Sequence, residues 1–415
     1  MTPEPLPLIE HFLGSRSRHI DLSDVVIAAV QHIQGSTASM LNHFHQLGVP
    51  FSNMYVLGKS YSTHPAVMHL LGELGAYVHP GSTLFEAHRL TSDYREQLRI
   101  FAQEMLRRVM AELPRNRARR LLILDEGGII TPFARTCDMP VCAVEQTRSG
   151  ARFLAGIDGL RFPIVNVAES GAKLEHETPL IAHTIIKALE LRMAYHRPDL
   201  QLDGLRALIV GYGVIGEAVA RSLRTAGATV SIHDEDQARM TVGREAGFAA
   251  PDLSVSGSQA DVVIGCVGKS WPSEQLVDRL PNDALLACAS SANVEFLGFL
   301  HTALKQNNGM FPEVEAGRSG LPWGHGDYVV EHARGKRSWL LNAGFPVNFD
   351  GSIDVIPPRL MQITRALMVA GAIQALEGDP RHGLVPLRAD DQAFLVDSFY
   401  RMNPDQEEMY EWNSR

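Results

Sequence analysis

The sequence predicts an α/β protein with two doubly wound domains, the second inserted before a C-terminal return helix. Apolar strand-like runs alternate with helical patterns along the chain, which is typical of parallel sheets covered by helices. One such unit, residues 206–236, has strand, glycine-rich turn, helix, strand and acidic residue in order. A length of 415 residues is sufficient for two domains of ordinary size.

The first domain is expected to span 1–196 together with 355–385, leaving 386–415 as a C-terminal tail. The Arg197-Pro198-Asp199 segment marks its boundary, because the residue before a proline disfavours helix. Strands are expected at 25–30, 120–125 and 141–145, and helices at 36–47, 65–75, 91–113, 184–196 and 359–376.

The glycine-rich turn follows the buried strand 206–210. Gly211 permits a tight turn, Gly213 lets the backbone approach a pyrophosphate, and Gly216 lets helix and strand pack closely. Asp234 ends the next strand, where a carboxylate accepts hydrogen bonds from a ribose diol and repels a 2′-phosphate. This order of elements predicts a Rossmann domain that binds NAD in preference to NADP.

Two further strands, at 261–268 and 284–289, end in small residues. The carboxyl ends of such strands form the crevice in which a cofactor lies, so the Rossmann domain is expected to span 197–354. The cofactor-binding residues predicted from these segments are Gly211, Gly213, Val214, Ile215, Gly216, Asp234, Val267 and Gly268.

Composition narrows the class of protein. A formal net charge of −9 argues against a nucleic-acid partner. No run of 18 apolar residues indicates a membrane span, and the acidic, proline-rich N-terminus does not resemble a signal peptide. The four cysteines form neither a CxxC pair nor a metal-type cluster, so we expect no metal and a reducing, cytoplasmic location.

Five segments in order resemble the S-adenosylhomocysteine hydrolase family over residues 20 to 380. They are Leu122–Gly128, Val144–Gly150, Asn166–Lys173, Gly211–Gly216 and Leu340–Asn348. The resemblance implies that bound NAD⁺ oxidises a ribose 3′-hydroxyl, which acidifies the neighbouring C4′–H. A base then removes that proton, the 5′ substituent leaves, water adds, and the alcohol is regenerated.

The resemblance also implies catalytic residues. Lys173 falls where the family activates the 3′-hydroxyl, and Glu177 takes the place of a family aspartate one helical turn later. His32 matches a histidine that shuttles a proton near C5′, and Glu126 replaces an aspartate at a strand end. Glu145 matches the first of two consecutive glutamates. The alternatives are a surface Lys–Glu ion pair, a structural histidine and a turn residue.

On the cofactor side, Thr147 and Ser149 keep two of three hydroxyls that the family places beside the nicotinamide, and Asn348 fits the asparagine that holds its carboxamide. Asn348 equally fits a turn residue. At the substrate end the chain departs from the family. The residues expected to contact substrate are therefore Gln34, Ser36, Ser60, Thr63 and Gln146.

The chain retains the residues that would bind NAD and oxidise the hydroxyl, and it differs from the family in the residues that would contact the substrate. This pattern predicts an active enzyme with an altered nucleoside substrate. S-adenosylhomocysteine is the default substrate that the resemblance implies, with the enzyme acting as a hydrolase or lyase. Three alternatives stay open: a nucleoside-tailoring dehydratase, a plain NAD-dependent dehydrogenase or epimerase, and a non-catalytic regulator that binds NAD or adenosine. A homo-oligomer is expected from the resemblance.

Overall fold

The computed structural model describes residues 4–16, 20–85, 91–116, 118–306, 326–332, 335–378 and 381–403. The chain divides into two compact units. Unit 1 contains residues 1–84, 95–177 and 356–415, and unit 2 contains residues 85–94 and 178–355. Within the described ranges, no helix combines the length and apolar character needed to cross a membrane.

Unit 1 is built on a seven-stranded parallel sheet in the order β13-β6-β5-β4-β1-β2-β3. Its strands are β1 (Val25–Gln31), β2 (Met54–Gly58), β3 (Tyr77–Val78), β4 (Arg120–Asp125), β5 (Val141–Glu145), β6 (Pro163–Asn166) and β13 (Gly383–Pro386). The order reverses between β1 and β4, so the carboxyl ends of these two strands flank a topological switch point.

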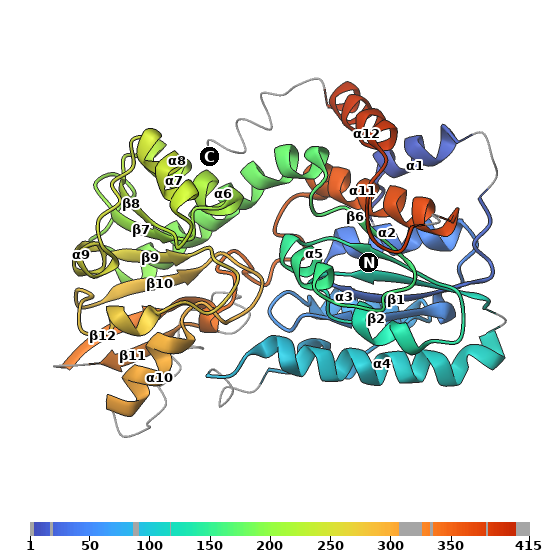
Figure 1. Cartoon of the computed structure of the whole chain (residues 1–415), viewed down its shortest axis with the longest axis horizontal. Coiled ribbons are helices and arrows are strands. Elements are labelled where there is room, and N and C mark those ends of the chain that lie inside the picture. The colour runs from blue at the N-terminus through green and yellow to red at the C-terminus, as the bar shows by residue number, and fades with distance from the viewer. Residues whose placement is uncertain are drawn as a thin grey trace. The chain divides into compact units, whose positions relative to one another are not determined.

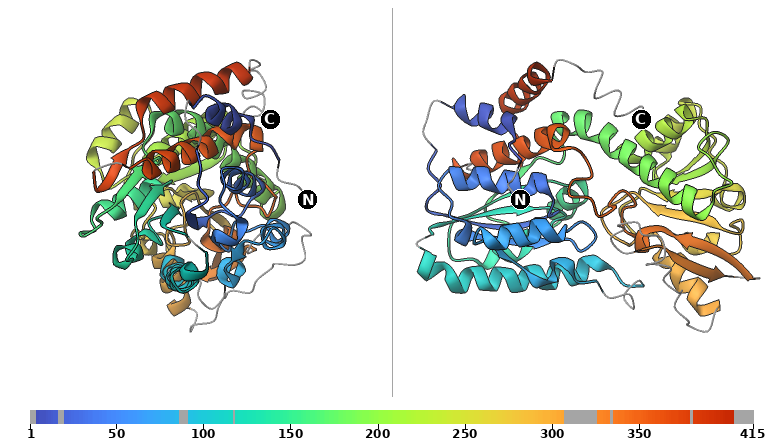
Figure 2. Two further views of the ribbon diagram at one scale, coloured as in Figure 1. Left: turned by 90° about the vertical axis from the view of Figure 1, so that its right-hand side faces the viewer. Right: turned by 180° about the vertical axis from the view of Figure 1, so that it is seen from behind.

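Helices cover both faces of this sheet (Figures 1 and 2). The helices of unit 1 are α1 (Pro7–Gly14), α2 (Gly35–Gln46), α3 (Pro65–Glu73), α4 (Tyr94–Asn116), α5 (Arg148–Ala155), α11 (Pro358–Leu376) and α12 (Ala389–Met402), with the start of α6 (Gly171–His196) as far as Glu177. Helices α2 and α11 lie on one face and α4 runs along the other. Short 3₁₀ turns stand at 51–53, 80–83 and 131–136.

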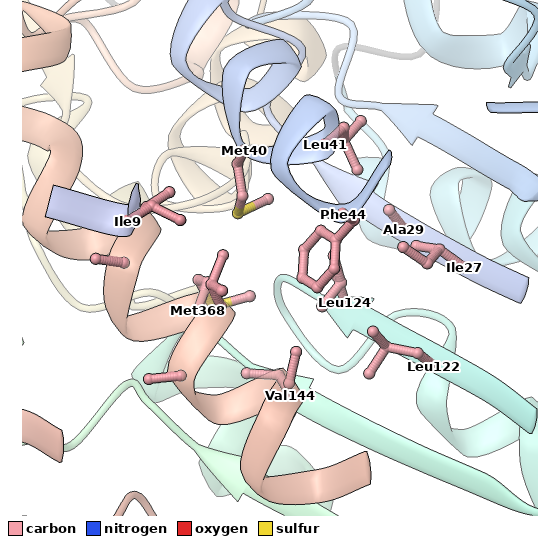
Figure 3. Packing of buried hydrophobic residues seen from close by; sticks show 14 of the residues in the cluster. Ile9, Ile27, Ala29, Met40, Leu41, Phe44, Leu122, Leu124, Val144 and Met368 are labelled. Carbon is pink, nitrogen blue, oxygen red and sulfur yellow. The ribbon is translucent and has the colours of Figure 1, made fainter. Parts of the chain in front are cut away.

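The core of unit 1 joins α1, α2 and α11 to the central strands (Figure 3). Phe44 of α2 lies beside alternate residues of β1, Ile27 and Ala29, and Met368 of α11 belongs to the same cluster; all four are fully buried. Because side chains alternate across a strand, the intervening residues of β1 face the opposite layer, so both faces of this strand are apolar.

Unit 2 has a six-stranded sheet in the order β11-β12-β10-β9-β7-β8, parallel except for the β11–β12 pair. Its strands are β7 (Arg206–Val210), β8 (Thr229–His233), β9 (Val262–Gly265), β10 (Ala284–Cys288), β11 (Tyr328–His332) and β12 (Lys336–Leu340). Its helices are α7 (Val214–Thr225), α8 (Gln237–Glu245), α9 (Leu253–Gln259) and α10 (Leu297–Gln306), with 3₁₀ turns at 273–276 and 341–344. The predicted α/β class with doubly wound sheets is confirmed.

The division between the units differs from the sequence-based boundary. It falls at Glu177, inside α6, and the part of α6 from Ala182 to Met193 packs into the core of unit 2. The C-terminal segment is not a bare tail, because α12 buries Leu395 and Phe399 in the core of unit 1. Residues 404–415 of that segment lie outside the described part of the chain.

Candidate active site

The glycine-rich turn of unit 2 has the geometry that its sequence predicts. Gly211 adopts φ +97°, a left-handed conformation that favours glycine. A Cβ on Gly216 would lie 1.9 Å from the carbonyl oxygen of Gly211, so only glycine allows α7 to begin this close to β7. A Cβ on Gly213 would meet nothing nearer than an Arg239 nitrogen at 3.6 Å, which leaves space for a ligand there.

The loop that follows β9 packs on this turn. A Cβ on Gly211 would lie 2.7 Å from the carbonyl carbon of Cys266 and 2.8 Å from the amide nitrogen of Val267. Gly268 ends the loop with φ +74°. Because β7 and β9 flank the switch point of this sheet, Val267 and Gly268 lie where a doubly wound fold binds its ligand.

Asp234 follows β8 and is almost buried, with its side chain 8% exposed. Its Oδ2 accepts a hydrogen bond from the amide of Tyr212 at 2.7 Å, and its Oδ1 accepts one from the amide of Asp236 at 2.9 Å. Arg239 lies 3.4 Å from Oδ2. The carboxylate is thus anchored to the glycine-rich turn. The turn, the start of α7 with Val214 and Ile215, and Asp234 together fit a dinucleotide.

The switch point of unit 1 carries a buried charged cluster. His32 directly follows β1 and Glu126 directly follows β4, and the Nε2 of His32 lies 2.5 Å from the Oε1 of Glu126. Lys59, directly after β2, places its Nζ 3.0 Å from the same oxygen. The side chain of His32 is 14% exposed and that of Glu126 is 4% exposed, so these contacts lie away from bulk water.

The cluster sets the ionisation of its members. Burial raises the pKa of Glu126, but the hydrogen bonds from His32 and Lys59 and the positive charge of Lys59 outweigh it and hold that pKa well below the ordinary value. Burial lowers the pKa of His32; Glu126 opposes that effect, and Lys59 and Arg365 reinforce it. Glu126 is therefore a carboxylate and His32 a neutral imidazole near pH 7.

The loop 58–63 closes around the imidazole. The Nδ1 of His32 is hydrogen-bonded to the hydroxyl of Ser62, and the ring of Tyr61 meets the imidazole edge-on at 5.7 Å. Thr63 donates its hydroxyl to the carbonyl of Lys59 at 2.9 Å. Ser60 is buried in the same turn. Two of the predicted substrate residues, Ser60 and Thr63, thus belong to the loop that holds His32.

A buried arginine, Arg365 of α11, lies at the start of α2. Its guanidinium donates to the hydroxyl of Ser36 at 3.3 Å and to the Oε1 of Gln31 at 3.4 Å. Gln34, the N-cap of α2, is also buried. These contacts place the predicted residue Ser36 beside a cationic group, and Gln34 lies two residues before it at the start of the same helix.

Lys173 and Glu177 form a second acid–base cluster. The Nζ of Lys173 lies 2.7 Å from the Oε2 of Glu177, and the hydroxyl of Thr364 donates to the same oxygen at 2.9 Å. The two side chains are 13% and 8% exposed, so this is a largely buried pair and not a solvated surface ion pair.

Glu145 lies at the end of β5, opposite Asp125 in register. Its carboxylate accepts hydrogen bonds from the amides of Gly127, Gly128 and Thr147 and from the Thr147 hydroxyl, at 2.7–3.1 Å. Burial and the neighbouring Asp125 raise the pKa of Glu145 to about 8. These contacts hold the turn after Glu126, so Glu145 has a clear structural function at this position.

Of the remaining predicted residues, three follow Glu145 in unit 1 and one lies in unit 2. Gln146 is buried, and its Oε1 has no hydrogen-bond partner within the part of the chain that the structure describes. Thr147 caps α5 and Ser149 is half-buried in its first turn. In unit 2, the amide of Asn348 donates to the hydroxyl of Thr184 at 3.1 Å.

Sequence reasoning missed Lys59, Ser62 and Arg365. Lys59 and Ser62 lie in the loop 58–63, and the position of that loop directly after a strand was the available signal. Arg365 lies in the middle of a long, mostly apolar helix, where an arginine flanked by buried residues indicated a buried partner.

The fold and the dinucleotide turn define an NAD-dependent, oxidoreductase-like enzyme of two α/β units. Residues 201–305 match the model of the acetohydroxy acid isomeroreductase NADPH-binding domain. The uncharacterised protein Rv0104 of Mycobacterium tuberculosis (strain H37Rv) is 31% identical over 417 residues, covering 97% of this chain and 75% of that protein. The chain belongs to the same family as this mycobacterial protein.

The adenosylhomocysteinase of Thermotoga maritima is 24% identical over 402 residues, covering 93% of this chain and 90% of that enzyme. The chain is thus a distant relative of the adenosylhomocysteinases and uses a cofactor of the NAD type. Among solved structures, the dipicolinate synthase A chain of Bacillus subtilis matches with a TM-score of 0.37 and 11% identity, covering 67% of this chain and 85% of that one. A TM-score this low has no bearing on function.

Proposed function

We propose that the protein transiently oxidises a ribose hydroxyl of a nucleoside, eliminates or hydrolyses the substituent at the 5′ position, and restores NAD⁺ in each turnover. The observation that carries this proposal is the presence of two buried acid–base clusters in unit 1, His32–Glu126–Lys59 and Lys173–Glu177. A plain dehydrogenase needs one acid–base group at its hydroxyl, whereas elimination needs further groups at the neighbouring carbons.

The Lys173 cluster suits the redox half of the reaction. NAD, when bound, accepts a hydride from the sugar carbon and later returns it. As the neutral amine, Lys173 accepts the proton of the 3′-hydroxyl, and Glu177 holds the lysine in position through the 2.7 Å contact. Thr364 fixes that carboxylate in turn through its hydroxyl.

The His32 cluster suits the elimination half. Oxidation at C3′ makes the C4′ proton acidic, and the ionised Glu126 is the carboxylate base for that proton. The electron pair left on C4′ forms the C4′–C5′ double bond as the 5′ substituent departs with its bonding pair. Water then adds at C5′ and gives a proton to neutral His32, which Ser62 holds. The double-bond pair returns to C4′, where protonated Glu126 gives back the proton that it removed.

Ionisation of Glu126 bears on the leaving group. A dehydratase must also protonate the departing hydroxyl, and Glu126, ionised in the resting cluster, has no proton to give until it has taken the one from C4′. The cluster therefore favours a substituent that leaves readily as an anion, such as a thiolate. S-adenosylhomocysteine fits this requirement, and a nucleoside with another 5′ substituent of this kind fits it equally.

The test combines mass spectrometry for bound NAD with absorbance at 340 nm after adding S-adenosylhomocysteine and a panel of 5′-substituted nucleosides. We expect a transient rise, full recovery of NAD⁺ and release of the leaving group. Stoichiometric accumulation of NADH would replace the proposal by a simple dehydrogenase or epimerase. Loss of hydroxide from a 5′-hydroxyl nucleoside would establish the dehydratase, and bound NAD with no response to any nucleoside would favour a regulator.

A further inference from the structure

Unit 2 contains a buried carboxyl group that the reaction above does not use. Glu295 lies between β10 and α10 and is fully buried. Its Oε1 accepts hydrogen bonds from the amide of Gly268 at 2.7 Å and from the hydroxyl of Ser290 at 2.6 Å.

Glu295 is packed directly against the end of β9. A Cβ on Gly265 would lie 2.9 Å from both the Cβ and the Oε2 of Glu295, so glycine at this position admits the glutamate. Gly268, three residues later, donates its amide to the same side chain. The glutamate therefore contacts both ends of the loop 266–268.

This loop touches the dinucleotide turn. A Cβ on Gly211 would clash with the backbone of Cys266 and Val267, and the amide of Cys266 donates to the carbonyl of Val210 at 2.7 Å. A chain of contacts thus runs from Glu295 through the loop to the glycine-rich turn. In a doubly wound sheet, these two loops flank the cofactor at the switch point.

We propose that Glu295 is a positioning residue for NAD: it holds the loop 266–268 against the dinucleotide turn, and its charge favours NAD⁺ over NADH. Ser290 shares this function as the hydroxyl that donates to the carboxylate. This inference depends on the NAD-type cofactor alone and not on the proposed reaction.

The surroundings of Glu295 let its charge change near neutral pH. Burial raises the pKa of Glu295 to about 7, although hydrogen bonds from Ser290 and Gly268 favour the ionised form. The titratable neighbours, Cys266 and Cys288, stay neutral thiols because burial raises the pKa of each well above its ordinary value. The nicotinamide ring is cationic in NAD⁺ and neutral in NADH, so ionised Glu295 discriminates between them.

The experiment measures the dissociation constants of NAD⁺ and NADH at pH 6 and pH 8 for the wild type, Glu295→Gln and Glu245→Gln. The amide of Gln keeps an acceptor for Gly268 and Ser290 but stays neutral. We expect the ratio Kd(NADH)/Kd(NAD⁺) to rise about threefold or more between the two pH values in the wild type. The ratio should stay flat in Glu295→Gln, and the exposed Glu245→Gln should behave as the wild type.

A second variant, Ser290→Ala, removes one hydrogen bond to the carboxylate and should move the midpoint of the pH dependence upward. A wild-type ratio that does not change with pH, or a Glu295→Gln variant with the same pH dependence as the wild type, would overturn the proposal. Neither measurement requires a substrate, so failure of the proposed reaction leaves this test unaffected.

Discussion

His32 Nε2 and Glu126 Oε1 lie 2.5 Å apart, at the ends of two neighbouring parallel strands. They are 94 residues apart in the chain and meet because β1 pairs with β4 at the switch point of the first sheet. Lys59 reaches the same oxygen from β2. The acid–base chemistry that we propose depends on these three side chains, which follow the neighbouring strands β1, β2 and β4.

Replacing Glu126 by Gln should destabilise unit 1, because it leaves the buried Lys59 ammonium without a carboxylate. We expect a loss of about 3–5 kcal/mol in the free energy of unfolding, measured by urea titration. The double variant Lys59→Met/Glu126→Gln should recover part of that loss. Glu73→Gln, which breaks an exposed ion pair with His69, is the control and should cost less than about 1 kcal/mol. Equal effects of the two single Glu substitutions would contradict the buried ion pair.

His32 should titrate below the ordinary histidine pKa of 6.5. The folded state then binds this proton less readily than the unfolded state. Its contribution to stability is thus fully present above pH 6.5 and falls as the pH drops toward the folded pKa. Carbon-13 NMR of labelled histidines, assigned with His32→Asn, measures this pKa directly. Lys59→Met should raise it, since the ammonium disfavours the imidazolium. A His32 pKa above 6.5 in the wild type would contradict the lowering of this pKa by burial and by Lys59.

Lys173→Met should abolish reduction of bound NAD⁺ by the substrate and leave NAD binding intact. The lysine is paired with Glu177 in unit 1, whereas the dinucleotide turn belongs to unit 2. The measurements are the 340 nm amplitude, expected to fall at least about a hundredfold, and the NAD content by mass spectrometry. Lys187→Met, on the same helix and 43% exposed, is the matched control. Full turnover by Lys173→Met would show that the proposed function of this residue is wrong.

Gly213→Ala and Gly216→Ala should separate folding from cofactor binding. A methyl at 216 would meet the Gly211 carbonyl at 1.9 Å, so this variant should lower both the melting temperature and NAD affinity. A methyl at 213 would meet no protein atom within 3.5 Å, so that variant should fold normally and lose at least about tenfold in NAD affinity. Wild-type NAD binding by Gly213→Ala would exclude close approach of the cofactor at this turn.

Asp234→Ser should shift the preference from NAD toward NADP. The change removes the charge that repels a 2′-phosphate and leaves Arg239, now 3.4 Å from the carboxylate, available to bind it. The ratio of NADP to NAD affinity, measured by calorimetry, should rise more than about tenfold. Glu235→Ser removes an adjacent but 60% exposed carboxylate and should leave the ratio unchanged. An equal ratio in Asp234→Ser and the wild type would show that Asp234 does not discriminate between NAD and NADP.

Local patterns were sufficient for much of the fold. The strands at 120–125 and 141–145 were predicted with the observed bounds, because continuous apolar runs bounded by turn residues are typical of buried parallel strands. Short or less apolar strands such as β6 and β13 were not predicted, since four residues carry too little periodicity. The strand expected at 261–268 ends at Gly265, where the chain turns toward Gly268.

By itself, the sequence determined the α/β class and the NAD-type cofactor, because glycines, turns and strand patterns act over neighbouring residues. The acid–base residues were predicted from the resemblance to a family. Only the tertiary structure decided which groups meet. Arg365 reaches Ser36 across 329 positions, and Lys59 reaches Glu126 across 67. Such contacts depend on strand order and helix packing, which no local pattern encodes, and they decide whether a buried charge is ionised and what it binds.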